Sequence, residues 1–380
     1  ESSATNNSNT YERDVNDVLS WMKETGKTLL AITALRAATS STRHHSPSKV
    51  GPSDPAATPT RASSLFRPVR SNQQYLKDIS TCHELIKSGE SYELCLTNAL
   101  KASNSETTAL NAYDIYKQLR TINPSPYGAY LQFGDTLGIA CSSPERFLRV
   151  ESNGKISSKP IKGTSPRSPD PSIDALLSSS LKNDVKNRAE NLMIVDLVRN
   201  DLGRVCQIGS VNVEKLFNVE SYATVHQMVS TISGKLQNHQ SAIDGIAACF
   251  PGGSMTGAPK LRTMEFLHDL EQGRKRGVYS GSIGYISPND VLDLNIVIRT
   301  AIVTGKDDES KVVSIGCGGA ITALSESDDE LDEMMLKAKA IVDATELAIM
   351  VKKKNNGRTD DTASGTVHGK ESSASSNNAI

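Results

Sequence analysis

Three short strand-like segments, separated only by brief turns, most restrict what this chain can fold into. They lie at 127–133, 138–142 and 146–150, and an Asn153-Gly154 turn follows the third. Strands joined this closely pair as antiparallel neighbours. Further strands are predicted at 93–100, 225–232, 281–286, 294–304 and 312–315.

Segments of helical composition lie between these strands. Gly89 and Gly203 stand just past two of them and are helix C-terminal signals. An α/β (α+β) fold is therefore predicted, with antiparallel sheets that carry helices on their outer faces. The predicted helices are 74–89, 108–122, 184–202, 242–248, 259–270 and 327–351.

The two ends of the chain differ in composition from its middle. Residues 39–72 are rich in Ser, Thr, Pro and Arg and predict a flexible linker. Residues 1–38 are then expected to be the remnant of a preceding N-terminal part, 73–351 the folded domain and 352–380 a disordered tail. The first residue is Glu, which indicates a fragment or a processed chain, and a lost targeting segment stays open.

Composition excludes several classes of function. The 380 residues are 37% hydrophobic and 22% charged, with a net charge of −1, which argues against nucleic acid as the main partner. No apolar run approaches the roughly 20 residues that span a bilayer. The six cysteines form no C-x-x-C pair, so a reducing compartment is expected.

In the stretch Lys159–Thr164 one lysine, Lys162, lies between Pro160-Ile161 and Gly163-Thr164. Pro160 fixes its own backbone, and Gly163 allows a close approach to a ligand, so a shaped turn presenting Lys162 is predicted. A solvated turn is the alternative. Only the segments that follow give this lysine a functional interpretation.

The helix predicted at 184–202 is apolar nearly all round, so its charged residues require partners. One interpretation is an internal network of Asp196, Arg199 and Asp201 that fixes the helix to a sheet. Glu190, near the helix start, is the better candidate for binding a ligand.

The last long helix carries a second set of acids. Ser327 and Glu330 have the spacing of a capping box, and Glu330, Glu333 and Lys337 share one face. A solvated charged stripe is the ordinary explanation. Carboxylates from this helix and Glu190 would nevertheless suit Mg²⁺, which takes a few carboxylates plus waters and substrate oxygens.

Two glycine-rich stretches offer backbone groups to an anion. The stretch 250–260, which contains Ser254, lacks the spacing of a nucleotide phosphate loop but leads into a helix. The stretch 316–320 is interpreted as a backbone nest for a carboxylate. Its cysteine lacks the partners of a nucleophile.

Three further residues stand out between these segments: His226, Tyr279 and Arg299. His226 lies on a predicted strand, where a core histidine is the usual case. Arg299 follows an apolar run, so a buried guanidinium there needs an anion.

Together these segments resemble the chorismate-utilising enzymes, a family of anthranilate, aminodeoxychorismate, isochorismate and salicylate synthases. The likeness runs from about Asp78 to Ala344. It is carried by residues 143–147, 189–204, 221–226, 251–260, 279–285, 298–300, 318–319 and 330–337. The Lys162 stretch and 91–98 are most similar to the aminodeoxychorismate synthases of fungi and plants.

The resemblance implies a two-lobed α/β/β/α sandwich, anthranilate-synthase-like, with the site between the sheets. It implies chorismate as substrate and a Mg²⁺ ion held by Glu190 and Glu333, with Glu330 as a further candidate. The substrate-binding residues implied are Tyr279, Arg299, Gly318, Gly319, Lys337, Thr164 and Ser254.

The resemblance also implies a chemistry. Glu145 would protonate the leaving C4 hydroxyl with help from His226. Lys162, as a neutral amine of lowered pKa, would add at C2. Ammonia from a glutamine amidotransferase domain or subunit would then enter at C4, giving 4-amino-4-deoxychorismate. A cytoplasmic location is expected, or a plastid in a plant.

Two departures from the family pattern leave alternatives open. Asn187 stands where an acid is common. Much of the family's N-terminal half and the amidotransferase module are absent from this sequence. Anthranilate or isochorismate synthase activity, or an inactive fragment that needs the missing half, therefore remain as alternatives.

Overall fold

The computed structural model describes residues 65–103, 107, 110–306 and 311–363, with side chains of the last helix through 355. The first half contains β1 (Arg67–Pro68), α3 (Asn72–Lys87), β2 (Glu93–Ala102), α5 (Ala112–Ile122), β3 (Tyr127–Phe133), β4 (Leu137–Ser143), β5 (Arg146–Val150), β6 (Lys155–Lys159), β7 (Ile161–Pro166), α6 (Pro171–Asn183) and α7 (Val185–Gly203). The second half contains β8 (Asn212–Ser221), β9 (Val225–Lys235), α8 (Ala242–Cys249), the 3₁₀ turn η1 (Gly253–Met255), β10 (Gly257–Ala258), α9 (Lys260–Leu270), β11 (Gly284–Ile286), β12 (Leu292–Asn295), β13 (Thr300–Thr304), β14 (Val312–Ile321) and α10 (Ser327–Ala363).

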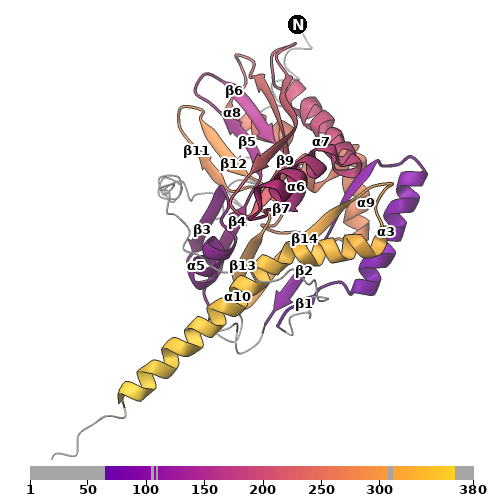
Figure 1. Cartoon of the computed structure of the whole chain (residues 1–380). Helices are drawn as coiled ribbons and strands as arrows, with labels where there is room; N and C mark the ends of the chain where they lie inside the picture. Colours follow the sequence, from indigo (N-terminus) through magenta and orange to yellow (C-terminus); the bar gives the residue numbers. More distant parts are fainter. Residues whose placement is uncertain (1–64, 104–106, 108–109, 307–310, 364–380) are drawn as a thin grey trace, which may run out of the picture.

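Two antiparallel sheets organise the described residues (Figure 1). The first sheet has the order β1-β2-β14-β13-β4-β3, with β10 also paired to β2. Helices α3, α5, α9 and α10 cover it, and their apolar faces share one core with its strands. Tyr75, Ile115 and Ile341 from three of these helices are fully buried there against Leu96 and Ile315.

The second sheet has the order β11-β12-β5-β6-β9-β7, with β8 paired to β9. Helices α7 and α8 pack against it, and Ile194 of α7 is buried with Leu148, Ile156 and Ile232 of the strands. Asp184 is the N-cap residue of α7, and its side chain accepts a hydrogen bond from the Asn187 backbone at 2.7 Å.

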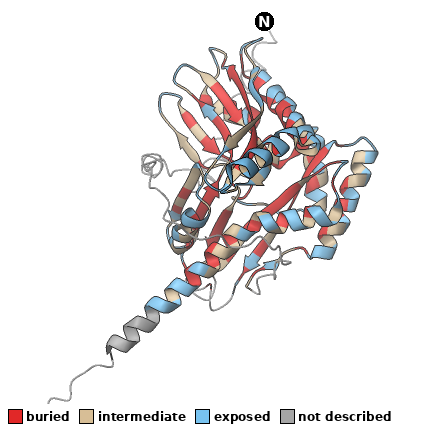
Figure 2. Ribbon diagram, viewed as in Figure 1, coloured by how far each residue is buried: buried red, intermediate tan, exposed pale blue. Residues whose placement is uncertain are grey.

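The two sheets meet through a small apolar cluster that includes Ala129, Ile139, Ile283 and Val297. Buried residues run along the strands of both sheets, whereas the outer helices alternate buried and exposed faces (Figure 2). The predicted mixed fold with largely antiparallel sheets is confirmed. No helix among the described residues is long and apolar enough to cross a membrane.

The strand predicted at 294–304 is wrong in an informative way. Its first residues end β12 in the second sheet, and its last form β13 in the first sheet. The chain passes between the sheets at 296–299, where Arg299 has a φ of +53°. The segment has strand-forming residues throughout, so its sequence predicts one continuous strand. A positive φ at a non-glycine residue cannot be predicted from amino-acid composition.

The predicted domain boundaries also need correction. Residues 65–72, expected in the linker, already contain β1, which pairs with β2, and the buried Arg70. At the other end α10 continues through Ala363, into the expected tail. The predictions for residues 1–38, for most of the linker and for the end of the tail lie outside the described residues.

Several elements escaped the sequence analysis, namely α6, β6, β8 and the short β1 and β10. The turn predicted around Lys162 is also wrong, because residues 161–166 form strand β7. The register of β7 against β9 shifts between Ile161 and Thr164, so Lys162 sits at a β-bulge.

Candidate active site

Lys162 joins the two sheets. The bulge in β7 aims its side chain across to β2, where Nζ lies 2.6 Å from Oε1 of Glu93. Lys162 is 9% exposed and Glu93 is 0% exposed. The next residue, Gly163, has a φ of +88°, and a Cβ there would lie 2.7 Å from the Asn187 side chain of α7. Glycine therefore permits both the bulge and the close packing of α7.

Glu93 is the functional candidate that the sequence analysis missed. It opens β2, directly before the buried run Leu94-Cys95-Leu96. Its Oε2 is buried and has no hydrogen-bond partner among the described residues. An acid at the head of an apolar strand was the available signal, since a buried charge requires a partner.

The predicted low pKa of Lys162 is wrong for the protein without substrate. Burial alone would lower the pKa, but the Glu93 and Glu190 carboxylates more than offset it and raise the pKa above its usual value. Lys162 is therefore an ammonium ion at neutral pH and has to lose a proton before it can act as a nucleophile.

Glu145 lies within the electrostatic reach of Lys162. It is buried, and the Ser254 hydroxyl and the Ile161 backbone N–H both bond to its carboxyl group. Burial raises its pKa to about 7, although these hydrogen bonds and Lys162 work in the opposite direction. A carboxyl group that is half protonated at neutral pH suits an acid catalyst. Glu145 and Ser254 also line one cavity together with Pro160 and Ile194.

Glu190 faces the same region from α7. It is buried and makes no hydrogen bond or ion pair with another described side chain. Burial raises its pKa to about 7, and Lys162 and Lys186 partly counteract this. By contrast, Asp196 and Arg199 are 79% and 51% exposed and pair on the surface, so the predicted internal network is wrong for them. Asp201 instead bonds Lys260 at 2.6 Å.

The acids of α10 are already paired. Glu330 is buried, accepts a hydrogen bond from the Ser325 hydroxyl at 2.6 Å and forms an ion pair with Lys186 at 2.9 Å. The predicted capping box between Ser327 and Glu330 is therefore wrong. Glu333 is partly exposed and pairs with Lys337 at 2.7 Å.

The donor set fits the Mg²⁺ ion that the resemblance implies. The described residues contain no group of three or more His, Cys, Asp or Glu placed to hold a metal by themselves. Glu190 is nevertheless a buried carboxylate without a hydrogen bond to any described residue, which suits an ion completed by water and substrate oxygens. Glu333 would have to exchange Lys337 for the ion.

The residues expected to bind substrate carboxylates lie around β14. The Tyr279 ring covers Gly316, where a Cβ would come within 2.1 Å of it, and burial raises the pKa of Tyr279 well above its usual value. Arg299 donates to the Lys337 carbonyl at 2.9 Å, and burial lowers the pKa of its guanidinium. Lys337 in turn donates to the Gly318 carbonyl at 3.2 Å.

The glycine stretch 316–320 is not the predicted nest. It lies inside β14 and pairs with β2 residue by residue. The small residues serve another purpose, because a Cβ on Gly319 would lie 2.9 Å from Glu330 and 3.8 Å from the Lys337 ammonium. Glycine thus keeps open the space in front of the α10 charges.

His226 and Thr164 lie apart from this cluster. The His226 Nε2 bonds Asp174 of α6 at 2.9 Å, and its Nδ1 bonds the Ser221 hydroxyl at 2.7 Å. Both ring nitrogens are occupied, so the structure ties His226 to α6 and β8. Thr164 is exposed and pairs with Gln227 of β9.

Comparisons with known proteins agree with this arrangement. The chorismate binding enzyme family matches residues 12–343. Aminodeoxychorismate synthase, chloroplastic, of Arabidopsis thaliana is 52% identical over 293 residues, which is 76% of this chain and 31% of that protein. Aminodeoxychorismate synthase component 1 of Salmonella typhimurium is 39% identical over 288 residues, which is 76% of this chain and 61% of that protein.

A solved structure extends the likeness to the fold. Anthranilate synthase component I of Streptococcus pneumoniae superposes with a TM-score of 0.64 at 34% identity, over 73% of this chain and 59% of that one. The family model covers most of the chain, and the fold of the two antiparallel sheets agrees with it. The chain belongs to the chorismate binding enzyme family. It spans about a third of the length of the Arabidopsis relative.

Proposed function

We propose that this chain carries the chorismate-aminating site of an aminodeoxychorismate synthase. Lys162 is the observation that carries the proposal, because a buried lysine between the two sheets gives the site a nucleophile beside a carboxyl acid. The high identity to proteins named aminodeoxychorismate synthase supports the same assignment. The product is 4-amino-4-deoxychorismate.

The reaction begins with substrate placement. Tyr279 and Arg299 bind the enolpyruvyl carboxylate. Lys337 receives the ring carboxylate beside Gly318, whose carbonyl it contacts, and in the space that Gly319 leaves. Mg²⁺ at Glu190 and Glu333 would supply positive charge that offsets the ring carboxylate.

Two proton-linked steps follow. The Lys162 amine attacks C2, the double bonds shift around the ring, and the C4 hydroxyl leaves as water with the Glu145 proton. Ammonia then attacks C4, the double bonds shift back and the C2–nitrogen bond breaks, which frees Lys162. The ammonium group formed at C4 returns a proton to Glu145.

This sequence of steps fixes the position of the amine. A nucleophile at C2 leaves C4 as the position open to ammonia, so the amine lies para to the ring carboxyl. The ammonia is proposed to come from a glutamine amidotransferase domain or subunit. Since the plant relatives are named chloroplastic, a plastid is the proposed location if the chain is a plant protein.

Product identification tests the proposal. The full chain is incubated with chorismate, ammonium and Mg²⁺, and the products are separated by chromatography and mass spectrometry. We expect 4-amino-4-deoxychorismate and no anthranilate. Anthranilate or isochorismate as the main product would replace this proposal with the corresponding synthase.

A further inference from the structure

Glu93 has a position that the proposed reaction leaves without a role. It is a fully buried carboxylate whose Oε1 lies 2.6 Å from the Lys162 ammonium. Within the part of the chain that the structure describes, its Oε2 has no hydrogen-bond partner, and its one side-chain contact is with Lys162. The contact that Glu93 makes is therefore with the nitrogen that has to lose a proton in the proposed reaction.

We infer that Glu93 is the base that deprotonates Lys162 before it attacks C2, an inference that rests on the proposed function. Its Oε1 takes one proton from the Lys162 ammonium, which leaves an amine that forms the bond to C2. When the C2–nitrogen bond breaks, the freed amine takes the same proton back from Glu93. The Glu145 proton leaves separately with the C4 hydroxyl, so each carboxyl group ends the cycle in its starting state.

Other proton acceptors are less well placed. Among the described residues, the one oxygen in hydrogen-bond contact with the Lys162 nitrogen belongs to Glu93. Transfer within this pair needs no water and no movement of another residue, because the Lys162 nitrogen and the Glu93 oxygen already lie 2.6 Å apart. The charged and titratable groups that face Lys162 are Glu93 and Cys95 of β2, Glu190 of α7, Glu145 before β5 and Glu333 of α10.

Glu93→Gln tests the base while it keeps the shape of the side chain. Without the Glu93 carboxylate, the Glu190 carboxylate still raises the pKa of Lys162, so the side chain becomes reactive only as hydroxide in solution removes its proton. At pH 7 we expect adduct formation to fall by about 10²–10⁴-fold, the usual contribution of a base. As the pH rises, the ratio of the parent rate to the variant rate should shrink by about tenfold per unit, because the amine fraction of the variant grows.

Glu271→Gln is the matched control. Glu271 is also buried and lies 2.6 Å from a cation, but that cation is Arg276, which does not give up its proton. Any rate loss in this control should keep a constant ratio to the parent across pH. Glu93→Asp, which retains a carboxylate, should also keep a constant ratio.

The measured quantity is the rate at which Lys162 forms its adduct with chorismate in the absence of ammonia, followed by mass spectrometry from pH 6 to 9. Mg²⁺-dependent chorismate binding and thermal melting show whether each variant is folded. A Glu93→Gln rate equal to the parent at pH 7 overturns the inference. A loss that does not change with pH, in a variant that still binds chorismate, also overturns it and makes Glu93 a structural partner. If Glu93→Gln does not fold, a Glu93→Asp ratio that shrinks with pH overturns it.

The same experiment separates this inference from the proposed function. A parent chain that makes 4-amino-4-deoxychorismate and the Lys162 adduct, with an unaffected Glu93→Gln variant, removes only the role of Glu93. A parent chain that makes the product without any Lys162 adduct removes both the covalent step and its base.

Discussion

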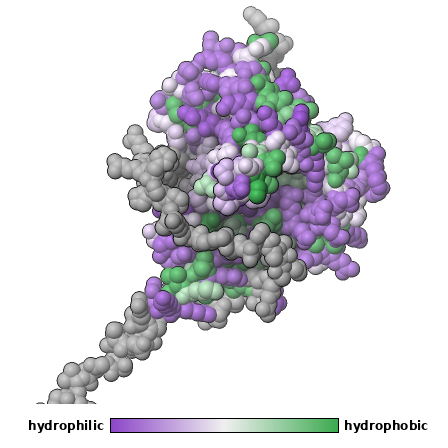
Figure 3. Space-filling view, in the orientation of Figure 1, coloured by the Kyte–Doolittle hydropathy of each residue, from purple (hydrophilic) through white to green (hydrophobic). Residues whose placement is uncertain are grey.

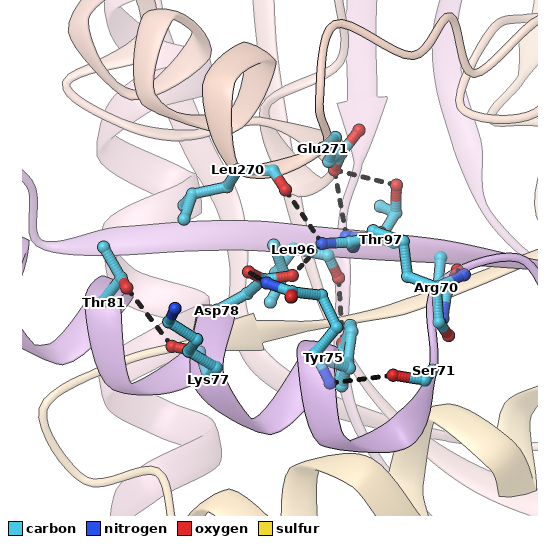
Figure 4. Close-up of polar contacts among 12 residues, drawn as sticks. Arg70, Ser71, Tyr75, Lys77, Asp78, Thr81, Leu96, Thr97, Leu270 and Glu271 are labelled. Atoms are coloured by element: carbon cyan, nitrogen blue, oxygen red, sulfur yellow. Dashed lines mark hydrogen bonds and ion pairs between the residues drawn. The ribbon is translucent and has the colours of Figure 1, made fainter.

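Two buried charge clusters lie between or beside the sheets, and they differ in how completely their polar atoms are paired. The Arg70 cluster contains Arg70, Asp78, Thr97 and Glu271 (Figure 4), and Arg276, which pairs with Glu271. The Lys162 cluster consists of Lys162, Glu93, Glu145 and Glu190. Both contain acids and bases that are largely shielded from water.

The Arg70 cluster is saturated with hydrogen bonds. The Arg70 guanidinium bonds Asp78 and the carbonyls of Thr97 and Leu270. Glu271 accepts from the backbone and hydroxyl of Thr97 at 3.0 and 2.9 Å and from Arg276 on both oxygens. Such a network fixes helix α3 and the 271–280 loop to β2, and its hydrogen bonds already occupy the charged groups that line the adjoining cavity.

The Lys162 cluster is incomplete. Glu93 has an unpaired oxygen, and Glu190 has no hydrogen bond to a described residue. Unpaired buried polar groups are rare and require an explanation. The saturated cluster therefore holds segments of the fold together, whereas the incomplete one has buried charge left for the charged ligand that we propose. The face shown in Figure 3 is hollowed between the two halves of the molecule, in keeping with a ligand site between the sheets.

Removal of the nucleophile should have the largest effect. Lys162→Ala is expected to abolish 4-amino-4-deoxychorismate formation and the covalent adduct, because no other amine occupies that place. Chorismate binding should remain close to normal, as measured by titration calorimetry. Full product formation by this variant would show that Lys162 is not the nucleophile.

A substitution of Glu190 should have the next largest effect on activity, because this buried acid makes no hydrogen bond to a described residue that a metal ion would have to replace. Glu190→Gln is expected to remove Mg²⁺-dependent turnover and to leave the melting temperature near that of the parent. Asp196→Asn, an exposed acid on the same helix, is the matched control and should respond to Mg²⁺ like the parent. Normal rates for Glu190→Gln at limiting Mg²⁺ would exclude Glu190 as a ligand.

Glu145 should contribute through its proton. Glu145→Gln is expected to lower kcat by about 10²–10⁴-fold with a smaller change in KM. The burial-raised pKa of about 7 gives a sign for the parent: the protonated acid is present below pH 7, so kcat should fall as the pH rises through that value. This decline should be absent in Glu145→Gln, and a loss confined to KM would make Glu145 a binding residue.

Most residues of the Lys162 cluster could be predicted from the sequence, but the contact between Lys162 and Glu93 could not. Lys162, Glu145 and Glu190 could be proposed as site residues from the residues next to them in sequence, from charges within apolar segments and from a family resemblance. The Lys162–Glu93 pair joins residues 69 positions apart, and only the bulge in β7 and the facing of the two sheets bring them together. Short-range patterns carry no information on such a pairing.

The errors have a common physical origin. The 294–304 segment has strand composition throughout, yet it crosses between sheets at a residue of positive φ. Asp196, Arg199 and Asp201 share a helix, but tertiary packing buries only Asp201 and gives it Lys260 from another segment. Periodicity predicts which residues share a helix, whereas the neighbouring segments decide which of them are buried.

A substitution in the Arg70 cluster should lower the stability of the fold and leave the catalytic rate unchanged. Arg70→Met leaves Asp78 buried without its cation, and breaking a buried ion pair in this way costs about 3–5 kcal/mol. We expect that loss in the unfolding free energy from urea titration. The kcat at a temperature where the variant is still folded should stay close to that of the parent. A catalytic loss without destabilisation would mean that the two clusters do not differ as described.

The smallest effect should come from an ion pair with the same nitrogen–oxygen distance as Lys162–Glu93. Lys339 and Asp343 on α10 also lie 2.6 Å apart, but their side chains are 46% and 41% exposed. Water screens this pair, so Lys339→Met should change the unfolding free energy by less than about 0.5 kcal/mol. Lys162→Met removes a cation at equal distance but leaves Glu93 buried, and its cost should be several times larger. Equal costs for the two variants would mean that distance, and not burial, decides what an ion pair contributes in this protein.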